Sequence, residues 1–291
     1  MYHSVGVEFE YSARIMLARL FSVLALLALA TCVAASEPKR VNGTIGNGGL
    51  LLIEAEVNAV HIQGIVDTGA SHHAYDRKLI PILEGFEAVG SGAVIGVCDP
   101  QRVLIGPMGD AVNIGSAVVD LTPFRTKSQV RFDAVIGIPF LVGRSVHIDP
   151  SRQRFTIQQS VIADVEGIRI QLDELKRPCV SLLIAEQEIR ALIDTGSNAT
   201  ITASEEEFER ILKHFARVNE RPAVTSLGLE GETQQRKMMV PRVEIGAHVV
   251  RDVGIVESKS TKIGMAFLNR FETVIDLLNL RLQLKALSDA P

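Results

Sequence analysis

The sequence predicts a mainly β protein with short helices, built from two similar lobes in tandem. The first observation is a duplicated pattern, in which an apolar run ends in Asp-Thr-Gly and small residues, at Ile65–Ser71 and again at Leu192–Asn198. The second is the spacing, because Asp194 follows Asp67 by 127 positions and other landmarks share this offset. The third is the alternation of apolar and polar residues before each copy, which is typical of half-buried strands.

The landmarks that share the 127-residue offset continue toward the end of each lobe. They are Ile136-Gly137 and Ile263-Gly264, Phe140-Leu141 and Phe267-Leu268, and Ile148-Asp149 and Ile275-Asp276. A single Asp-Thr-Gly indicates little more than a turn. A duplicated one with several matching landmarks downstream indicates a tandem repeat of one structural unit.

The chain divides into six segments on these patterns. They are a signal peptide (1–35), a flexible lead-in (36–49), a first lobe (50–158), an interlobe linker (159–178), a second lobe (179–286) and a tail (287–291). The lead-in is expected to be flexible because it is polar and rich in glycine. In the linker, Ile168, Ile170 and Leu172 alternate with polar residues, which is compatible with a strand shared between the lobes.

The first segment has the features of a cleaved signal peptide. Leu20–Ala30 forms an apolar core of secretory length, and Val33–Ala35 offers small residues for cleavage before Ser36. A retained transmembrane helix needs about 20 clean apolar residues, and Arg19 interrupts the run. We therefore expect an exported protein, periplasmic or secreted, that has no membrane association after cleavage.

Two alternatives concern this segment. Glu8 and Glu10 are atypical of the start of a signal peptide, so translation from Met16 would give a more regular one. Cys32 lies in a weak match to a bacterial lipoprotein motif, and a lipid anchor there is the minority interpretation.

The composition fits a globular protein and argues against some partners. The chain is 47% hydrophobic and 22% charged, which is enough to build a sizeable core. Its net charge of −4 has both signs interspersed, so nothing indicates nucleic-acid binding. Cys98 and Cys179 alone remain after the signal peptide, and a disulfide between them or two separate buried thiols are both open.

The clearest helix is predicted in the second lobe. Ser204 and Glu207 form a capping box at its start. One apolar face follows at helical spacing, made of Phe208, Ile211, Leu212 and Phe215. The first-lobe counterpart follows Asp76 and is expected to be stopped by Pro81.

The motifs resemble those of the pepsin and retropepsin superfamily of aspartic proteases. Its pattern is two apolar residues and Asp-Thr-Gly-[Ser/Ala], followed some 70 residues later by two apolar residues and Gly. The later element is Ala134–Gly137 in the first lobe and Lys262–Gly264 in the second, where a lysine takes the outer position. The closing elements are similar to those of bacterial bilobal aspartyl-protease-like proteins, and the resemblance covers about residues 50–286.

The resemblance implies two acid-protease-like β-barrel lobes with an active-site cleft between them. Both halves of such a site lie in one chain here, so we expect a monomer that contains an intramolecular pseudo-dimer. It also implies an aspartic endopeptidase acting on a peptide or protein substrate, with no metal or organic cofactor. The alternative is a non-catalytic peptide- or protein-binding module that keeps the same fold.

The expected catalytic residues are Asp67 and Asp194. Two facing carboxyl groups can hold one water and one proton, because two charges of like sign so close cannot both form easily. One acid then stays protonated while the other accepts a proton from the water, and the titration belongs to the pair.

The neighbours of the two aspartates have expected supporting roles. Gly69 and Gly196 allow the two backbones to approach closely. The resemblance implies that Thr68 and Thr195 each reach across to the opposite loop. It also implies that the hydroxyl of Ser197 supports the outer oxygen of its aspartate, whereas Ala70 offers no such donor.

Glycine-rich hairpins are the candidates for mobile flaps over the site. The glycines are Gly90, Gly92 and Gly96 in the first lobe and Gly228 and Gly231 in the second. A plain surface hairpin would have the same sequence. Tyr75, the only tyrosine after the signal peptide, comes too early to be the flap tyrosine of pepsin-like enzymes.

Other polar residues have simpler interpretations. His61, His72 and His73 are expected to form a surface cluster and not a metal site, because no other ligands stand at metal-binding spacing. Asp149 and Asp276 each follow an apolar run and are interpreted as structural acids at strand ends.

Overall fold

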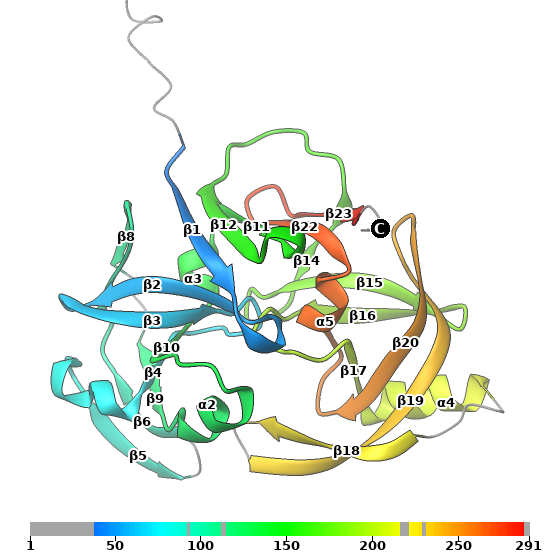
Figure 1. Ribbon diagram of the computed structural model, residues 1–291, viewed down its shortest axis with the longest axis horizontal. Helices are drawn as coiled ribbons and strands as arrows, with labels where there is room; N and C mark the ends of the chain where they lie inside the picture. Colours follow the sequence, from blue (N-terminus) through cyan, green and yellow to red (C-terminus); the bar gives the residue numbers. More distant parts are fainter. Residues whose placement is uncertain (1–37, 92–93, 112–114, 216–220, 229–230, 288–291) are drawn as a thin grey trace, which may run out of the picture. The chain divides into compact units, whose positions relative to one another are not determined.

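The computed structural model describes residues 38–91, 94–111, 115–215, 221–228 and 231–287 (Figure 1). The predicted signal peptide, with Met16 and Cys32, and the flap glycine Gly92 lie outside these residues. The described chain is mainly β with a few short helices, which confirms the predicted fold class. Along this part of the chain, no helix combines the length and the apolar character that crossing a membrane requires.

The strands of the described residues form one sheet of fifteen and another of eight. The first lobe contributes β2 (Leu51–Val57), β3 (Val60–Val66), β4 (Ala74–Asp76), β5 (Glu87–Ser91), β6 (Val94–Cys98), β7 (Arg102–Ile105), β8 (Met108–Ala111), β9 (Ser116–Val119) and β10 (Ala134–Ile136). The second lobe forms the smaller sheet from β14 (Gln171–Leu172), β15 (Pro178–Ile184), β16 (Gln187–Ile193), β17 (Ile201–Ser204), β18 (Arg221–Gly228), β19 (Gly231–Ile245), β20 (His248–Ser258) and β21 (Lys262–Ile263).

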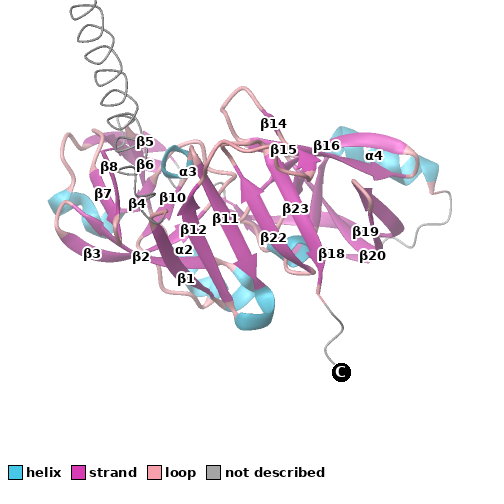
Figure 2. Cartoon of the chain, turned by 90° about the horizontal axis from the view of Figure 1, so that it is seen from above, coloured by secondary structure: helices cyan, strands magenta, loops and turns pink. Residues whose placement is uncertain are grey.

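The other six strands of the larger sheet, which come from both halves of the chain, lie side by side, as Figure 2 shows for β1, β12, β11, β22 and β23. They are β1 (Arg40–Ile45), β11 (Arg144–Asp149), β12 (Arg154–Gln159), β13 (Ile168–Arg169), β22 (Phe271–Asp276) and β23 (Arg281–Ala286). At the centre of this group β11 pairs with β22, so that Val146 lies opposite Ile275 and Ile148 opposite Thr273. Since β22 is β11 displaced by 127 positions, the two equivalent strands pair as in a contact between the halves of a twofold dimer.

The helices are short. They are η1 (Asn47–Gly49), η2 (Arg77–Ile82), α2 (Thr122–Ser128), α3 (Ile138–Leu141), η3 (Pro150–Arg152), α4 (Glu205–His214) and α5 (Met265–Leu268). In α4 the Ser204 hydroxyl accepts a hydrogen bond from the Glu207 amide, and Phe208 and Ile211 are buried, as the capping box and apolar face predicted. The first-lobe counterpart η2 is a 3-10 helix that contains Pro81.

The segment expected to be a flexible lead-in is instead structured. Residues 40–45 form β1, which pairs with β12 and with β2. A Cβ atom on Gly43 would lie 2.3 Å from the ring of Phe155. Glycine is therefore present here to let an aromatic ring pack against the strand, and its role is not flexibility.

The linker joins the two sheets. Its strand β13 pairs with β23 in the larger sheet, and β14 pairs with β15 in the smaller one. Ile170, between them, is buried. The alternation in the linker sequence thus corresponds to two short strands, one in each sheet.

The two cysteines are separate. Cys98 and Cys179 are both buried and free, so the interpretation as two thiols is confirmed and a disulfide between them is excluded. Burial raises the pKa of each thiol above its usual value.

Candidate active site

The two Asp-Thr-Gly loops begin where equivalent strands end. Asp67 follows β3, which is parallel to β10, and Asp194 follows β16, which is parallel to β21. The amide of Asp67 donates to the carbonyl of Ile136 at 3.0 Å, and that of Asp194 donates to Ile263 at 2.9 Å. Each aspartate therefore leaves its strand at a point that a parallel neighbour fixes.

A second glycine packs against the backbone of each Asp-Thr-Gly loop. A Cβ atom on Gly137 would lie 2.6 Å from the carbonyl oxygen of Ala70, and one on Gly264 would lie 2.7 Å from that of Ser197. No larger residue fits at either place without moving backbone. This contact accounts for the glycine that recurs 70 residues after each aspartate.

Thr68 and Thr195 tie the loops together in a reciprocal arrangement that we call the threonine lock. The Thr195 hydroxyl accepts from the Thr68 amide at 3.0 Å and donates to the Val66 carbonyl at 2.8 Å. The Thr68 hydroxyl accepts from the Thr195 amide at 3.2 Å and donates to the Ile193 carbonyl at 2.6 Å. Both threonines are fully buried, so these bonds face no competition from water.

The lock brings the two aspartates together. A Cβ atom on Gly69 would lie 2.6 Å from the carboxyl carbon of Asp194, and one on Gly196 would lie 2.3 Å from Oδ2 of Asp67. Each carboxyl group thus lies over the glycine of the opposite loop. The charge of Asp194 is close enough to raise the pKa of Asp67, and we refer to Asp67 and Asp194 as the dyad.

Backbone donors hold the inner oxygen of each carboxyl group. The Gly69 amide donates to Oδ1 of Asp67 at 2.7 Å, and the Gly196 amide donates to Oδ1 of Asp194 at 3.0 Å. These bonds stabilise the ionised form of each group. They leave the second oxygen of each aspartate for other contacts.

The pKa of Asp67 is raised from 3.8 to about 8. The largest cause is burial of the carboxyl group, followed by repulsion from Asp194, while the Gly69 amide and more weakly Lys262 lower the pKa. Asp67 therefore keeps its proton to a higher pH than an ordinary aspartate does.

Lys262 makes a contact that the sequence did not predict. Its Nζ donates to Oδ2 of Asp194 at 2.8 Å, and 30% of the lysine side chain but only 7% of the aspartate side chain is exposed. The resemblance had assigned support of this oxygen to Ser197. Instead, the Ser197 hydroxyl accepts from the Ala199 amide at 3.4 Å. The lysine, on the other side of the carboxyl group, supplies the donor.

Arg177 reaches the first loop from the turn between β14 and β15. Its guanidinium donates to the carbonyl of Gly69 at 3.3 Å and forms an ion pair with Asp173 at 2.7 Å. No motif singled out this arginine. The contact ties the interlobe linker to the loop that carries Asp67.

The candidate flap glycines within the described residues lie in hairpins. Gly90 lies in β5 and Gly96 in β6, and these strands pair with each other. In the second lobe Gly228 ends β18 and lies opposite Gly231, which begins β19.

The other polar residues have structural roles. His73 is buried, contrary to the expectation of a surface cluster, because its Nδ1 accepts from the Gly137 amide at 3.0 Å. Asp149 accepts from the Arg152 amide and Asp276 from the Leu278 amide, so both close turns after strands. Within the described residues, no group of histidine, cysteine and acidic side chains is arranged to hold a metal ion.

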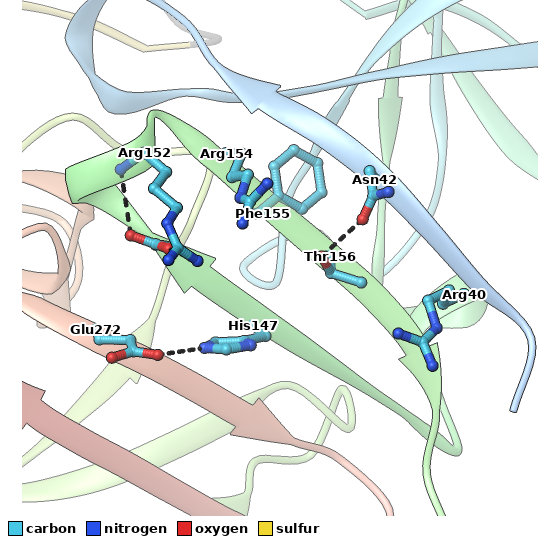
Figure 3. Close-up of a pocket in the computed structure, with 9 residues that line it drawn as sticks. Arg40, Asn42, His147, Arg152, Arg154, Phe155, Thr156 and Glu272 are labelled. Carbon is cyan, nitrogen blue, oxygen red and sulfur yellow. Dashed lines mark hydrogen bonds and ion pairs between the residues drawn. The ribbon is translucent and has the colours of Figure 1, made fainter.

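A cavity of about 260 Å³ lies elsewhere, on the polar surface of β1, β11, β12 and β22 (Figure 3). His147 and Glu272 form a hydrogen bond at its edge, as do Asn42 and Thr156. Of the arginines that line it, Arg152 forms an ion pair with Asp149. The cavity includes no predicted site residue.

Comparison with known protein families finds a match in the second lobe. Residues 180–267 match the protein family described as "Aspartyl protease". The match includes Asp194, Lys262 and Gly264, and it runs from β15 to α5. The comparison with curated proteins found no match. The match thus covers most of the second lobe, with its Asp-Thr-Gly loop and the glycine packed against it, and supports an aspartyl protease family for this part of the chain.

Proposed function

We propose that this protein is an aspartic endopeptidase that hydrolyses peptide bonds with a water activated between Asp67 and Asp194. The observation that supports it most is the arrangement of the two carboxyl groups, each over the glycine of the opposite loop and close enough for Asp194 to raise the pKa of Asp67. Carboxyl groups in such contact lose two protons in well-separated steps, so one acid and one base coexist over a range of pH. Amide hydrolysis needs both at once.

The reaction follows from this pairing. The ionised carboxylate accepts a proton from water as the water oxygen attacks the carbonyl carbon, and the protonated partner donates to the carbonyl oxygen. When the tetrahedral intermediate collapses, the C–N bond breaks and the leaving nitrogen takes up the proton that came from water. The carbonyl oxygen returns its proton to the acid. The dyad is then restored, and no metal or organic cofactor is needed.

We also propose that the enzyme is a monomer and that it is exported. Both aspartates come from one chain, and the threonine lock joins its two lobes, so a second chain is not needed to complete the site. Export is proposed from the sequence of residues 1–35, with a mature N-terminus near Ser36. The substrate is a peptide or protein.

The test is cleavage of a random peptide library by the exported protein and its variants. Asp67→Asn and Asp194→Asn should each abolish cleavage and leave circular dichroism spectra unchanged. Asp149→Asn is the matched control, since Asp149 only closes a turn, and it should retain cleavage. Substantial turnover in either dyad variant would remove the two-carboxylate mechanism.

A binding module without catalysis is the second candidate. The observation that favours it is the ammonium of Lys262 on the outer oxygen of Asp194, because this contact occupies part of the dyad. The same library separates the two functions. Peptides retained by the wild type with no new termini, at any pH from 3 to 8, would favour the binding module (roughly the range in which such a dyad titrates).

A further inference from the structure

We propose that Lys262 is a positioning residue of the dyad, which keeps Asp194 ionised and thereby assigns the shared proton to Asp67. The catalytic consequence rests on the proposed peptidase function, whereas the placement of the proton does not. The inference begins from a single contact, the ion pair of 2.8 Å between Nζ of Lys262 and Oδ2 of Asp194.

The backbone around Lys262 fixes the direction of its side chain. The strand β21 lies between β16, where Leu192 is its register partner, and β17, where Thr202 is its register partner. Two residues later, Gly264 is packed against the loop of Asp194. A lysine at this position is therefore directed along the aspartate loop by the sheet itself, and the contact does not depend on a mobile surface chain.

The surroundings supply few competing charges. The neighbouring β17 and α5, with the sequences Ile-Thr-Ala-Ser and Met-Ala-Phe-Leu, carry no titratable side chain. Arg177 approaches the first loop, but it contacts a backbone carbonyl and is already paired with Asp173. Among the ion pairs of the described residues, Lys262 is the cation that contacts a dyad carboxylate.

The first lobe has no equivalent of this lysine. The position that precedes Lys262 by 127 residues is Val135, which lies next to Ile136 in β10 and has no charge to offer. Burial of Asp67 and the charge of Asp194 raise its pKa, and they outweigh the Gly69 amide and the weaker effect of Lys262, which lower it. The two carboxyl groups have unequal environments, so the proton resides on Asp67 and Asp194 acts as the base toward water.

The proposal predicts the direction in which the two pKa values of the dyad change when the charge of Lys262 is removed. A cation beside Asp194 favours loss of the first proton from the dyad, so it lowers the lower of the two pKa values of the pair. Its influence on the second proton is weaker, since Lys262 is the smallest of the influences on Asp67. Removing the charge should raise the lower pKa by about one unit, the size expected for one charged hydrogen bond. The upper pKa should rise less.

The experiment is a carbon-13 NMR titration of the aspartate carboxyl groups. It uses the complete mature protein, which contains both lobes, without substrate. Lys262→Met keeps most of the side-chain length, and Lys262→Val reproduces the first-lobe residue. Lys262→Arg keeps the charge. Lys285→Met is the matched control, because it removes the same charge from another ion pair, the one with Glu272 at 2.9 Å.

The expected result is a lower pKa of the dyad that rises by about one unit in Lys262→Met and Lys262→Val. It should stay near the wild-type value in Lys262→Arg and in the Lys285 control. A lower pKa that is the same in wild type and in the two uncharged variants would overturn the proposal. So would an arginine variant shifted as far as methionine, because the effect would then come from altered packing and not from charge.

Cleavage provides the second arm. The acidic limb is the part of the pH profile in which kcat/KM falls as the pH decreases. One pH unit below the wild-type midpoint of this limb, kcat/KM of Lys262→Met should be about tenfold lower than that of the wild type. At pH values above the limb, the two proteins should approach the same kcat/KM. A rise in kcat/KM at every pH would overturn the proposal, since the lysine would then be obstructing the site. A wild type that cleaves nothing, with the NMR shift present, would overturn the peptidase function and support the proton assignment.

Discussion

Replacing Thr195 with valine is expected to destabilise the fold by roughly 2–6 kcal/mol, since two buried groups lose their partner at a cost of about 1–3 kcal/mol each. Valine has nearly the shape of threonine, so the change removes the hydroxyl and leaves the packing. The Thr68 amide loses an acceptor at 3.0 Å, and the Val66 carbonyl loses a donor at 2.8 Å. Because Thr195 is fully buried, water cannot replace either bond.

The assay is urea unfolding followed by far-ultraviolet circular dichroism, because the chain contains no tryptophan to report on unfolding. Thr195→Ser is the matched control, since it keeps the hydroxyl and loses one methyl group at a cost of about 1 kcal/mol. Thr68→Val should resemble Thr195→Val, and the double variant should lose less than the sum, as the two hydroxyls belong to one network. A valine variant as stable as the serine variant would refute the reasoning.

Three further predictions follow from the dyad. Gly196→Ala should abolish cleavage with retained secondary structure, since its Cβ would lie 2.3 Å from Oδ2 of Asp67; an active variant with an unchanged circular dichroism spectrum would contradict this. Because the pKa of Asp67 rises from 3.8 to about 8 on folding, its protonation stabilises the fold at low pH, and this contribution is lost as pH rises through that interval. Asp67→Asn should therefore reduce the decline of the urea midpoint between these pH values, and an unchanged slope would argue against it. Ala70→Ser should leave the acidic limb of kcat/KM in place, because the equivalent Ser197 hydroxyl accepts from the Ala199 amide while Lys262 supplies the donor to Asp194; a limb that falls by about one pH unit would show instead that a hydroxyl here donates to the ionised dyad.

The frame of the site could be predicted from sequence because its requirements are local. The Asp-Thr-Gly loop needs a strand before it and a glycine packed against it, and both leave visible patterns. The bounds of β15 and β16 are those of β2 and β3 displaced by 127 positions. The same holds for α5 relative to α3.

Features that depend on distant contacts could not be predicted in this way. The glycine-rich residues 40–49 have the composition of a flexible segment, yet Gly43 packs on Phe155, which lies far along the chain. The short helix α2 has Pro123 in its first turn, where a missing amide hydrogen costs little. Its sequence has no capping box to announce it. Lys262 was visible at an unusual position, but its contact with Asp194 depends on how three strands align.

The backbone contacts that hold the two Asp-Thr-Gly loops are equivalent in the two lobes. The side chains that contact the two carboxyl groups differ between the lobes. The Ile138 amide donates to Ala70 at 2.9 Å, and the equivalent Met265 amide donates to Ser197 at 2.7 Å.

Around the carboxyl groups, in contrast, Lys262 of the second lobe corresponds to Val135 of the first. A site made from two identical chains could not hold such a difference, since every substitution would appear on both sides of the twofold axis. Two similar lobes in one chain are free to diverge. One carboxyl group can then have a cation beside it and the other none, and a proton that a symmetric pair would share equally has a fixed place.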